Sequence, residues 1–285
     1  MKILSSFRFW IVALLLVAAV SCRQAGDREI RVMTFNIRLS PSVDFDGDYC
    51  WNNRREAAVR IIGESEPDLF GIQEGYVVQV DYLEEQLPGY GRYGVSSADC
   101  LGRGEANAIF WRKDRFDLVQ DGIFWLSETP DTVSLGWDGA YKRTVVWAQL
   151  RDRLRGRDVW FFNTHFDHAG VVAQVEAGKL LAARMKAMVP EGDAIFLAGD
   201  FNVNWDSPVL DPIRQMLLGC RETAPVTDDW NTYHGWGEVN IPAGEGIIDH
   251  IFFRGAEAER YELLFGDKGA PFFSDHWPVL GVLRY

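Results

Sequence analysis

Several short segments of this chain are apolar on both alternating faces, and this pattern constrains the fold more than any other feature of the sequence. In residues 159–165, Val159 and Phe161 lie on one face of an extended segment, and Trp160 and Phe162 lie on the other. A strand with two apolar faces must be covered on both sides. Strands are predicted over residues 31–37, 68–73, 106–112, 144–150, 159–165, 194–201, 247–253 and 278–283.

A smaller number of segments carry apolar residues at helical spacing. We predict helices over residues 54–65, 77–87, 171–189 and 208–218. The chain after residue 30 has no linker-like stretch and no internal repeat. Many strands and few helices within one domain, residues 30–285, predict two β-sheets packed face to face with helices outside.

The N-terminal segment has a different character. Two basic residues precede an unbroken apolar run over residues 9–20, and Ser21 and Cys22 follow it. This run of 12 residues is too short to span a bilayer, but it suits the core of a signal peptide. A cysteine after a small residue at this place is typical of a bacterial lipoprotein.

We therefore predict a signal peptide over residues 1–21, lipidation of Cys22 and a polar tether over residues 22–29. Such a protein is anchored to a membrane of the cell envelope, on the periplasmic side or at the outer surface, without spanning it. Ala19 stands where a lipoprotein signal usually has Leu. A plain secretory signal and a buried helix stay open as alternatives.

Charge and cysteine content exclude some classes of function. The formal net charge is −12, and loss of residues 1–21 removes two positive charges and no negative ones, which gives −14. Bulk attraction to long polyanions such as DNA is therefore disfavoured. Cys50, Cys100 and Cys220 show no zinc-binding spacing and are expected to be structural. Nothing in the sequence predicts a protein partner.

Polar side chains gather where the predicted strands end. Residues two apart in a strand share a face, so Asn163 and His165 form one pair and Asp200 and Asn202 form another. Further polar residues stand at strand ends or interrupt strands: Asn36, Glu74, Asp249, Asp275 and His276. Because Asp249 and His250 are adjacent, only one of them can face a shared site. We choose Asp249, since a carboxylate has few other reasons to lie between isoleucines.

Four of these residues are carboxylates, namely Glu74, Asp200, Asp249 and Asp275. Buried together, they would repel one another strongly without a cation. Carboxylate and amide oxygens suit Mg²⁺, with Mn²⁺ as a substitute, and make a poor structural zinc site. For any one of them alone, a role in a surface turn is the simpler explanation, but their recurrence at successive strand ends favours a site.

These segments together resemble the endonuclease/exonuclease/phosphatase superfamily, which includes deoxyribonuclease I. The resemblance runs from about Arg31 to Tyr285. The matching motifs are Thr34-Phe35-Asn36, Gln73-Glu74, Asn163-Thr164-His165, Gly199-Asp200-Phe201-Asn202, Ile248-Asp249-His250 and Ser274-Asp275-His276-Trp277-Pro278. It implies a four-layered α/β sandwich around two mainly antiparallel sheets. Other motifs resemble a secreted bacterial branch near the carbon catabolite repressor-type deadenylases.

The resemblance also implies roles for the motif residues. Glu74 would be the main Mg²⁺ ligand, with Asn36 and Asp275 nearby. Asp200 would position or deprotonate the attacking water, and Asn202 would orient the phosphate. His276, with Asp249 holding its imidazole, and His165 would face the scissile phosphate.

Other residues are weaker candidates. Arg143 is a candidate phosphate ligand, with a strand-edge salt bridge as the alternative. Asp167 and His168 are expected to line the pocket. Asp46 is a candidate for a second metal, against a turn role, and His234 for a loop that touches substrate, against a solvated loop.

The leading functional hypothesis is a Mg²⁺-dependent phosphoesterase, and more specifically a phosphodiesterase. Nucleic acid or nucleotides, phospholipid head groups and sugar or inositol phosphates all stay open as substrates. No basic run for tracking a polynucleotide and no long hydrophobic insertion for entering a bilayer is present. A phosphomonoesterase of the inositol-phosphate type and a non-catalytic binding lipoprotein are the alternatives.

Overall fold

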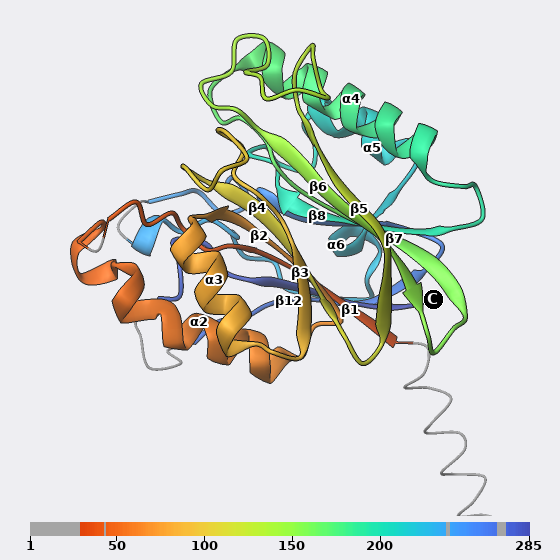
Figure 1. The fold of residues 1–285 in the computed structure, drawn as a ribbon, viewed down its shortest axis with the longest axis horizontal. Coiled ribbons are helices and arrows are strands. Elements are labelled where there is room, and N and C mark those ends of the chain that lie inside the picture. The colour runs from red at the N-terminus through yellow and green to blue at the C-terminus, as the bar shows by residue number, and fades with distance from the viewer. Residues whose placement is uncertain (1–28, 43, 238–239, 267–271) are drawn as a thin grey trace, which may run out of the picture.

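Two β-sheets packed face to face form the centre of the computed structural model, which describes residues 29–42, 44–237, 240–266 and 272–285 (Figure 1). The predicted signal peptide and Cys22 lie outside these described residues. Within them, no helix has the length and apolar character needed to cross a membrane.

The first sheet has seven strands in the order β10-β12-β13-β1-β2-β4-β3. Their bounds are β1 Glu29–Asn36, β2 Leu69–Gly75, β3 Tyr90–Tyr93, β4 Ala106–Arg112, β10 Val226–Thr227, β12 Glu257–Leu263 and β13 Val279–Arg284. β1 runs parallel to β2, and β10 runs parallel to β12. The other neighbours in this sheet are antiparallel.

The second sheet has six strands in the order β5-β6-β7-β8-β11-β9. Their bounds are β5 Phe116–Trp125, β6 Thr144–Asp152, β7 Arg157–His165, β8 Ala194–Asp200, β9 Leu218–Gly219 and β11 Asp249–Arg254. Only β7 and β8 are parallel here. Both sheets are thus mixed but mainly antiparallel, as the family resemblance implies.

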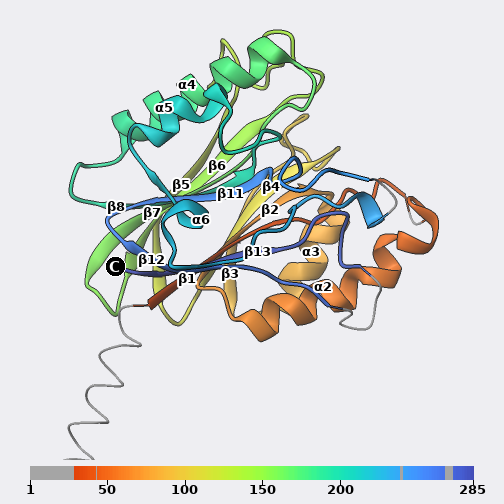
Figure 2. The same cartoon turned by 180° about the vertical axis from the view of Figure 1, so that it is seen from behind.

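Helices cover the outer face of each sheet and complete the four layers (Figures 1 and 2). α2 (Trp51–Ser65) and α3 (Val77–Gln86) pack on the first sheet, and α4 (Val171–Met188) and α5 (Asp211–Arg214) pack on the second. Shorter elements are α6 Cys220–Thr223 and the 3-10 turns η1 Gly47–Tyr49, η2 Pro208–Leu210 and η3 Gly235–Gly237. The predicted arrangement of helices outside two facing sheets is confirmed.

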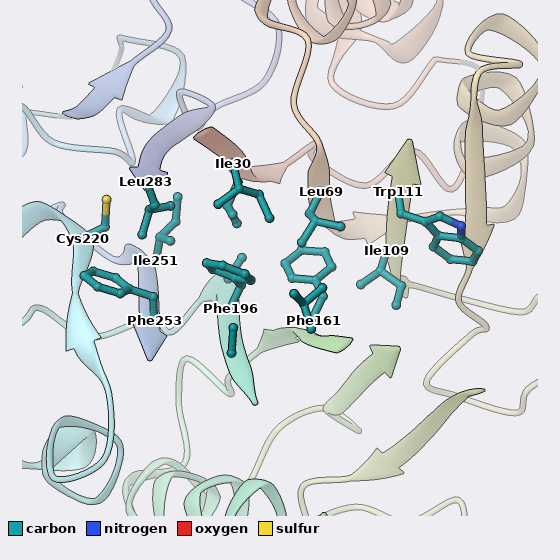
Figure 3. Packing of buried hydrophobic residues seen from close by; sticks show 14 of the residues in the cluster. Ile30, Leu69, Ile109, Trp111, Phe161, Phe196, Cys220, Ile251, Phe253 and Leu283 are labelled. Atoms are coloured by element: carbon teal, nitrogen blue, oxygen red, sulfur yellow. The ribbon is translucent and has the colours of Figure 1, made fainter. Parts of the chain in front are cut away.

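The main core lies between the two sheets. Side chains such as Ile30 and Leu69 from the first sheet meet Phe161 and Phe196 from the second (Figure 3). All four are fully buried. This explains the two-faced strands, because β7 buries Phe161 between the sheets and Trp160 under α4. At about 25 cal/mol per Å² of apolar surface, burial of each large side chain stabilises the fold by roughly 1.5–3 kcal/mol.

Two kinds of element differ from the sequence prediction. β3, β5, β10 and β12 were not predicted, and the exposed middle of β5 at the sheet edge explains why it lacks a clear apolar pattern. The helix predicted over residues 208–218 is also wrong in extent. It divides into η2 and α5, because Pro212 cannot continue a helix from Leu210, and Leu218 instead begins β9 beside β11.

The layer between the sheets changes character along its length. On β1 the inward face runs from Ile30 and Val32 to Thr34 and Asn36, from apolar to polar. β2, β7 and β8 change in the same way toward their carboxyl ends. Because β1 is parallel to β2 and β7 is parallel to β8, these polar ends meet at one end of the sandwich.

Candidate active site

Strand register brings the polar ends together around Asp200. His165 on β7 pairs with Asp200 on β8, and Asp249 on β11 pairs with Asp200 from the other side. A cavity of about 420 Å³ opens over this cluster. It is lined by Arg38, Leu39, Glu74, Glu105, Tyr141, Arg143, His165, His168, Asp200, Asn202, Tyr233, Ile248, Asp275 and His276.

Asp200 is the centre of the cluster and is almost fully buried. Its Oδ1 accepts a hydrogen bond from the backbone N–H of Asn202 (2.9 Å), and its Oδ2 accepts one from Asn36 Nδ2 (3.0 Å). Oδ2 also lies 3.5 Å from His165 Nε2 and 3.9 Å from His276 Nε2. Burial, with added repulsion from Asp249, raises the pKa of Asp200 to about 7.

His276 is held by Asp249. The Nδ1 atom of His276 lies 2.8 Å from Asp249 Oδ2, and both side chains are buried. Burial by itself would lower the pKa of His276, but the neighbouring Asp249 carboxylate outweighs it and raises that pKa to about 10. His276 is therefore a cation at neutral pH. His250, on the opposite face of β11, hydrogen bonds the carbonyl of Val203 (2.9 Å) away from the cavity.

His165 is held in a different state by Arg143. Arg143 Nη1 lies 2.8 Å from His165 Nδ1 and 3.2 Å from Glu105 Oε2. A guanidinium only donates, so Nδ1 must accept and the proton sits on Nε2, which faces Asp200. Burial and the charge of Arg143 hold the pKa of His165 well below its usual value. His165 is thus a neutral hydrogen-bond donor toward the cavity.

Oxygen donors suited to a divalent cation line the same cavity. Glu74 and Asp275 both face it, and burial, with added repulsion from Glu74, raises the pKa of Asp275. Asn36 Nδ2 donates to Glu74 Oε1 (3.0 Å) as well as to Asp200. The only nearby guanidinium on this side, among the described lining residues, is Arg38, 3.7 Å from Asp275 Oδ2. The carboxylate oxygens of Glu74 and Asp275 fit a hard divalent ion, whereas the Asn36 oxygen accepts the backbone N–H of Arg38 (3.0 Å).

A further group of possible ligands lies deeper. Asp200, Asp249 and His276 each offer a ligand atom within 4.8 Å of the other two. The hydrogen bond between Asp249 and His276 already occupies His276 Nδ1, and Asp249 Oδ1 is buried without a partner among the described residues. This arrangement suits proton handling by the trio, and Glu74 and Asp275 stay the predicted metal ligands.

Unusual backbone geometry positions the functional side chains. Glu74 (φ 61°), Asn202 (φ 53°) and Arg38 (φ 56°) all adopt the left-handed conformation that non-glycine residues rarely take. Glu74 lies where the β2–β4 pairing is interrupted between Ile72 and Gly75. Such irregularities redirect side chains beside active sites. Here the interruption places the Glu74 carboxylate against the backbone N–H of Leu39 (3.0 Å).

Asn163 does not line the cavity, although the sequence pairs it with His165. It is fully buried between the sheets, where its Nδ2 donates to the carbonyls of Ile72 (2.8 Å) and Ala108 (3.0 Å). Its Oδ1 accepts from Gln73 Nε2 (2.6 Å). This arrangement requires glycine at position 71, since a Cβ there would lie 2.5 Å from Asn163 Oδ1. Asn163 therefore joins the sheets next to the site.

The weaker candidates fall into different places. His168 lines the cavity with Tyr141, but Asp167 lies outside its lining. The Asp167 carboxylate accepts backbone N–H groups from Ala140, Tyr141, Ala169 and Gly170, which lower its pKa against the effect of burial. Asp167 thus fixes the loop that carries Tyr141.

Two other candidates from the sequence are already engaged within the protein. Asp46 holds Arg38 through two contacts of 3.0 and 3.2 Å. The ring of His234 stacks against those of Trp277 and Phe272, with centroid distances of 4.3 and 4.8 Å. The three cysteines of the described chain, Cys50, Cys100 and Cys220, form no disulfide.

Among the residues with polar side chains that line the cavity, the sequence reasoning missed four. These are Arg38, Glu105, Tyr141 and Tyr233. Arg38 lies two residues beyond the Asn36 motif, so its position was the one available signal. The others come from loops, whose distance from the motif strands in space cannot be inferred from spacing.

Comparisons with known proteins agree with this architecture. The sequence model of the Endonuclease/Exonuclease/phosphatase family matches residues 33–276. The chain is also similar to an uncharacterized protein of Acanthamoeba polyphaga mimivirus, at 26% identity over 65% of this chain and 71% of that protein.

Solved structures of similar proteins cover nearly the whole described chain. A mannosyl-6-phosphatase of Bacteroides thetaiotaomicron VPI-5482 is 31% identical, with a TM-score of 0.81 over 90% of this chain and 100% of the other. An endonuclease/exonuclease/phosphatase from Bacteroides vulgatus is also 31% identical, with a TM-score of 0.84 over 90% and 98%.

Proposed function

Because the chain belongs to the Endonuclease/Exonuclease/phosphatase family, it is a hydrolase of phosphoric ester bonds, and we propose that its substrate is a phosphomonoester of a sugar. Divalent-metal dependence is general in this family, and we propose Mg²⁺ as the ion, with Mn²⁺ as a substitute. The phosphodiester expected from the sequence is the competing substrate class.

One observation carries the choice of a monoester. The reacting cluster lies in a cavity of about 420 Å³, within the size range of sites for small ligands, with Arg143 and His276 as cations on its wall and floor. These two cationic groups, together with a divalent ion, would attract the doubly charged phosphate of a monoester. One similar protein is a mannosyl-6-phosphatase, which supports a sugar as the alcohol.

The residues of the chain divide the work of hydrolysis among themselves. Glu74 and Asp275, with Asn36 beside them, would hold the ion. A divalent ion bound there would offset the negative charge of the phosphoryl oxygens and favour attack by water. Asp200, with a pKa near neutrality, takes a proton from the attacking water. Asn202 is fixed next to it by the 2.9 Å backbone hydrogen bond and orients the phosphate.

The two histidines serve the phosphate in different protonation states. His276, kept cationic by Asp249, offsets the charge that develops on the phosphoryl oxygens. His165, kept neutral by Arg143, donates its Nε2–H to an oxygen of the same group. Asp200 lies between them, so base and donors converge on one small volume.

The test measures phosphate release by the purified protein. Mannose 6-phosphate, 4-nitrophenyl phosphate and bis(4-nitrophenyl) phosphate are each assayed with Mg²⁺, with Mn²⁺ and with EDTA. We expect metal-dependent turnover of the monoesters, with the sugar phosphate preferred and the diester slow. Faster turnover of the diester would overturn the choice of monoester. Absence of metal-dependent turnover on all three would overturn the proposed reaction.

A matched pair of variants connects the activity to the site. Asp200→Asn removes the proposed base, and Asp131→Asn makes the same change at an exposed residue paired only with Arg184 on the surface. Turnover should fall in the first variant and stay at the wild-type level in the second. Equal activity of the two variants would remove Asp200 from the mechanism.

We also propose that the enzyme is anchored in the cell envelope through lipid on Cys22. β1 starts at Glu29 and ends at Asn36, so the chain enters the sandwich at the end opposite the cavity. The tether would then leave the cavity open to substrate. Fractionation of cells tests this: the protein should sediment with membranes, and Cys22→Ser should release it. Recovery of both forms in the soluble fraction would contradict the anchor.

A further inference from the structure

A second cavity adjoins the catalytic one and has no role in the chemistry described above. It measures about 350 Å³ and is lined by Tyr76, Ser97, Ala98, Gly104, Glu105, Leu135, Ala140, Tyr141 and Lys142. Glu105 and Tyr141 line both cavities, so the two share a wall. We name this second cavity the side pocket.

The shared wall lies a short way from the reacting centre. Glu105 contacts Arg143 at 3.2 Å, Arg143 contacts His165 at 2.8 Å, and His165 lies 3.5 Å from Asp200. Three contacts thus connect the entrance of the side pocket to the proposed base. A part of the substrate that binds in the side pocket can therefore be linked to the reacting phosphate directly or through one small chemical unit.

The walls of the side pocket are held in place from several directions. Lys142 Nζ donates to the carbonyl of Ala98 (2.9 Å), and Trp125 Nε1 donates to that of Ser97 (2.8 Å). Asp167 holds the backbone of Ala140 and Tyr141 from below. These bonds tie the loop between β5 and β6 to the loop before β4. A preformed pocket loses little entropy when it binds a ligand.

The chemistry of the walls indicates what fits. Tyr76, Leu135 and Tyr141 give the pocket a largely apolar lining with two aromatic rings, and Tyr141 is braced by the Arg143 guanidinium, 5.4 Å from its ring centroid. Leu135 and Tyr141 remain 48% and 54% exposed. A pyranose ring presents C–H groups on its face and hydroxyls at its edge, so it can pack on the rings while its edge reaches Ser97 or Glu105.

Charge disfavours the main alternative occupant. The Glu105 carboxylate stands at the passage between the two cavities, and its cationic partner among the described contacts, Arg143, is already shared with His165. The one cation of the pocket lining, Lys142, donates to the carbonyl of Ala98, so a second phosphate, as in a polynucleotide, would meet the Glu105 carboxylate at the passage and be repelled by it. An uncharged ring would not.

We infer that the side pocket is a subsite for a second, uncharged sugar ring, so that the preferred substrate is a phosphorylated oligosaccharide and not a free monosaccharide phosphate. This inference rests on the proposed function, because it names the part of the substrate that the leaving group carries beyond the phosphorylated sugar. Binding energy from that remote ring is used to hold the reacting ester in place.

The experiment compares two substrates on the intact protein. One is mannose 6-phosphate, and the other is a mannobiose with its phosphate on O6 of the non-reducing mannose. We expect kcat/KM to be about tenfold higher for the disaccharide, as one good ring contact would give. Equal values for the two substrates would overturn the subsite, whereas absence of metal-dependent phosphate release from both would overturn the proposed function itself.

A variant that fills the pocket gives the second readout. Leu135→Trp adds bulk from the exposed wall of the side pocket, and Leu135 does not line the catalytic cavity. The matched control is Leu154→Trp, at a leucine that is 58% exposed in the β6–β7 turn outside both cavities. Leu135→Trp should abolish the preference for the disaccharide and leave kcat/KM for mannose 6-phosphate unchanged, and the control should change neither.

A smaller change guards against misfolding of the tryptophan variant. Tyr76→Ala removes one aromatic wall without adding volume, and Tyr76 also lines only the side pocket of the two. It should reduce the disaccharide preference by severalfold. A preference that survives both Leu135→Trp and Tyr76→Ala would place the second ring elsewhere and refute the assignment.

Discussion

Substitution of Gly71 by alanine should damage the protein far more than its size suggests. The new Cβ would lie 2.5 Å from Asn163 Oδ1 and 2.9 Å from Asn163 Cβ, well inside van der Waals contact. Both residues are buried between the sheets, and Asn163 cannot retreat without leaving its partners. Overpacking of this kind costs roughly 1–3 kcal/mol on its own.

The hydrogen bonds of Asn163 add to that cost. They satisfy the carbonyls of Ile72 and Ala108 and the amide of Gln73, all inside the sandwich. A buried polar group left without a partner costs about 1–3 kcal/mol. Together with the overpacking, Gly71→Ala should lower the free energy of unfolding by about 2–6 kcal/mol. That is a large share of the roughly 5–15 kcal/mol of an ordinary domain.

Urea denaturation followed by tryptophan fluorescence measures this change, and Gly63→Ala is the matched control. Gly63 lies within α2 with nothing within 4 Å of the position of an added Cβ, so alanine there should stabilise the protein by about 0.5–1 kcal/mol. In an Asn163→Gly background, Gly71→Ala should cost much less, because neither the amide nor the Cβ of residue 163 remains to clash. A loss below about 1 kcal/mol for Gly71→Ala alone would refute the argument that Asn163 is fixed.

Three further predictions concern the site and its surroundings. Asp200→Asn should lower kcat by roughly 10²–10⁴-fold, because it removes the proposed base. It should not lower the free energy of unfolding measured in EDTA, since it removes a buried carboxylate close to Asp249. Clear destabilisation would show that the role of Asp200 is structural. Arg143→Met should lower kcat/KM by about ten- to a hundredfold in steady-state assays, because His165 and Glu105 lose a charged partner; an unchanged value would remove it from the site. Burial lowers the pKa of His250 to about 4, so below pH 6.5 the unfolded chain binds a proton that the folded chain refuses. The free energy of unfolding should therefore fall between pH 7 and pH 5, by roughly 2 kcal/mol from this group, and urea titrations of His250→Gln should show a drop smaller by that amount.

The sandwich could be predicted from the sequence because its burial pattern is local. β7 carries Phe161 on one face and Trp160 on the other, and both faces are buried in the structure. β5 escaped prediction because an edge strand with an exposed middle shows no such pattern. A strand with only one buried face, or with none, does not carry apolar residues on both faces, so this pattern cannot reveal it.

The site was accessible from the sequence to the extent that its residues lie on strands. Asp200 and His165 face each other because the register of two parallel strands places them so, and that register follows from the apolar residues before them. Glu105 and Tyr141 belong to loops whose meeting depends on bonds between distant segments, such as the one from Lys142 to Ala98. Strand periodicity contains no information about such contacts.

Strand alternation also cannot distinguish a side chain that faces substrate from one that joins the sheets. Asn163 and His165 share a face of β7, yet the first is closed off beneath Gly71 and the second reaches the cavity. What separates them is how far along the strand the second sheet still covers the first. At Asn163 the opposing carbonyls of Ile72 and Ala108 are close enough to bond, and one step further on the same face the partner is Asp200.

The two histidines show why this depth matters for the chemistry. His165 and His276 both direct Nε2 toward Asp200, in the same buried volume, where burial alone would make both neutral. The partner on Nδ1 decides the outcome. Arg143 can only donate and keeps His165 neutral, whereas Asp249 accepts and keeps His276 charged. Asp200 is therefore flanked by one neutral donor, His165, and one cation, His276. The site can bind a phosphate without a third positive charge next to those of Arg143 and His276. The neighbour of each imidazole, and not its exposure, therefore sets the electrostatic balance of the site.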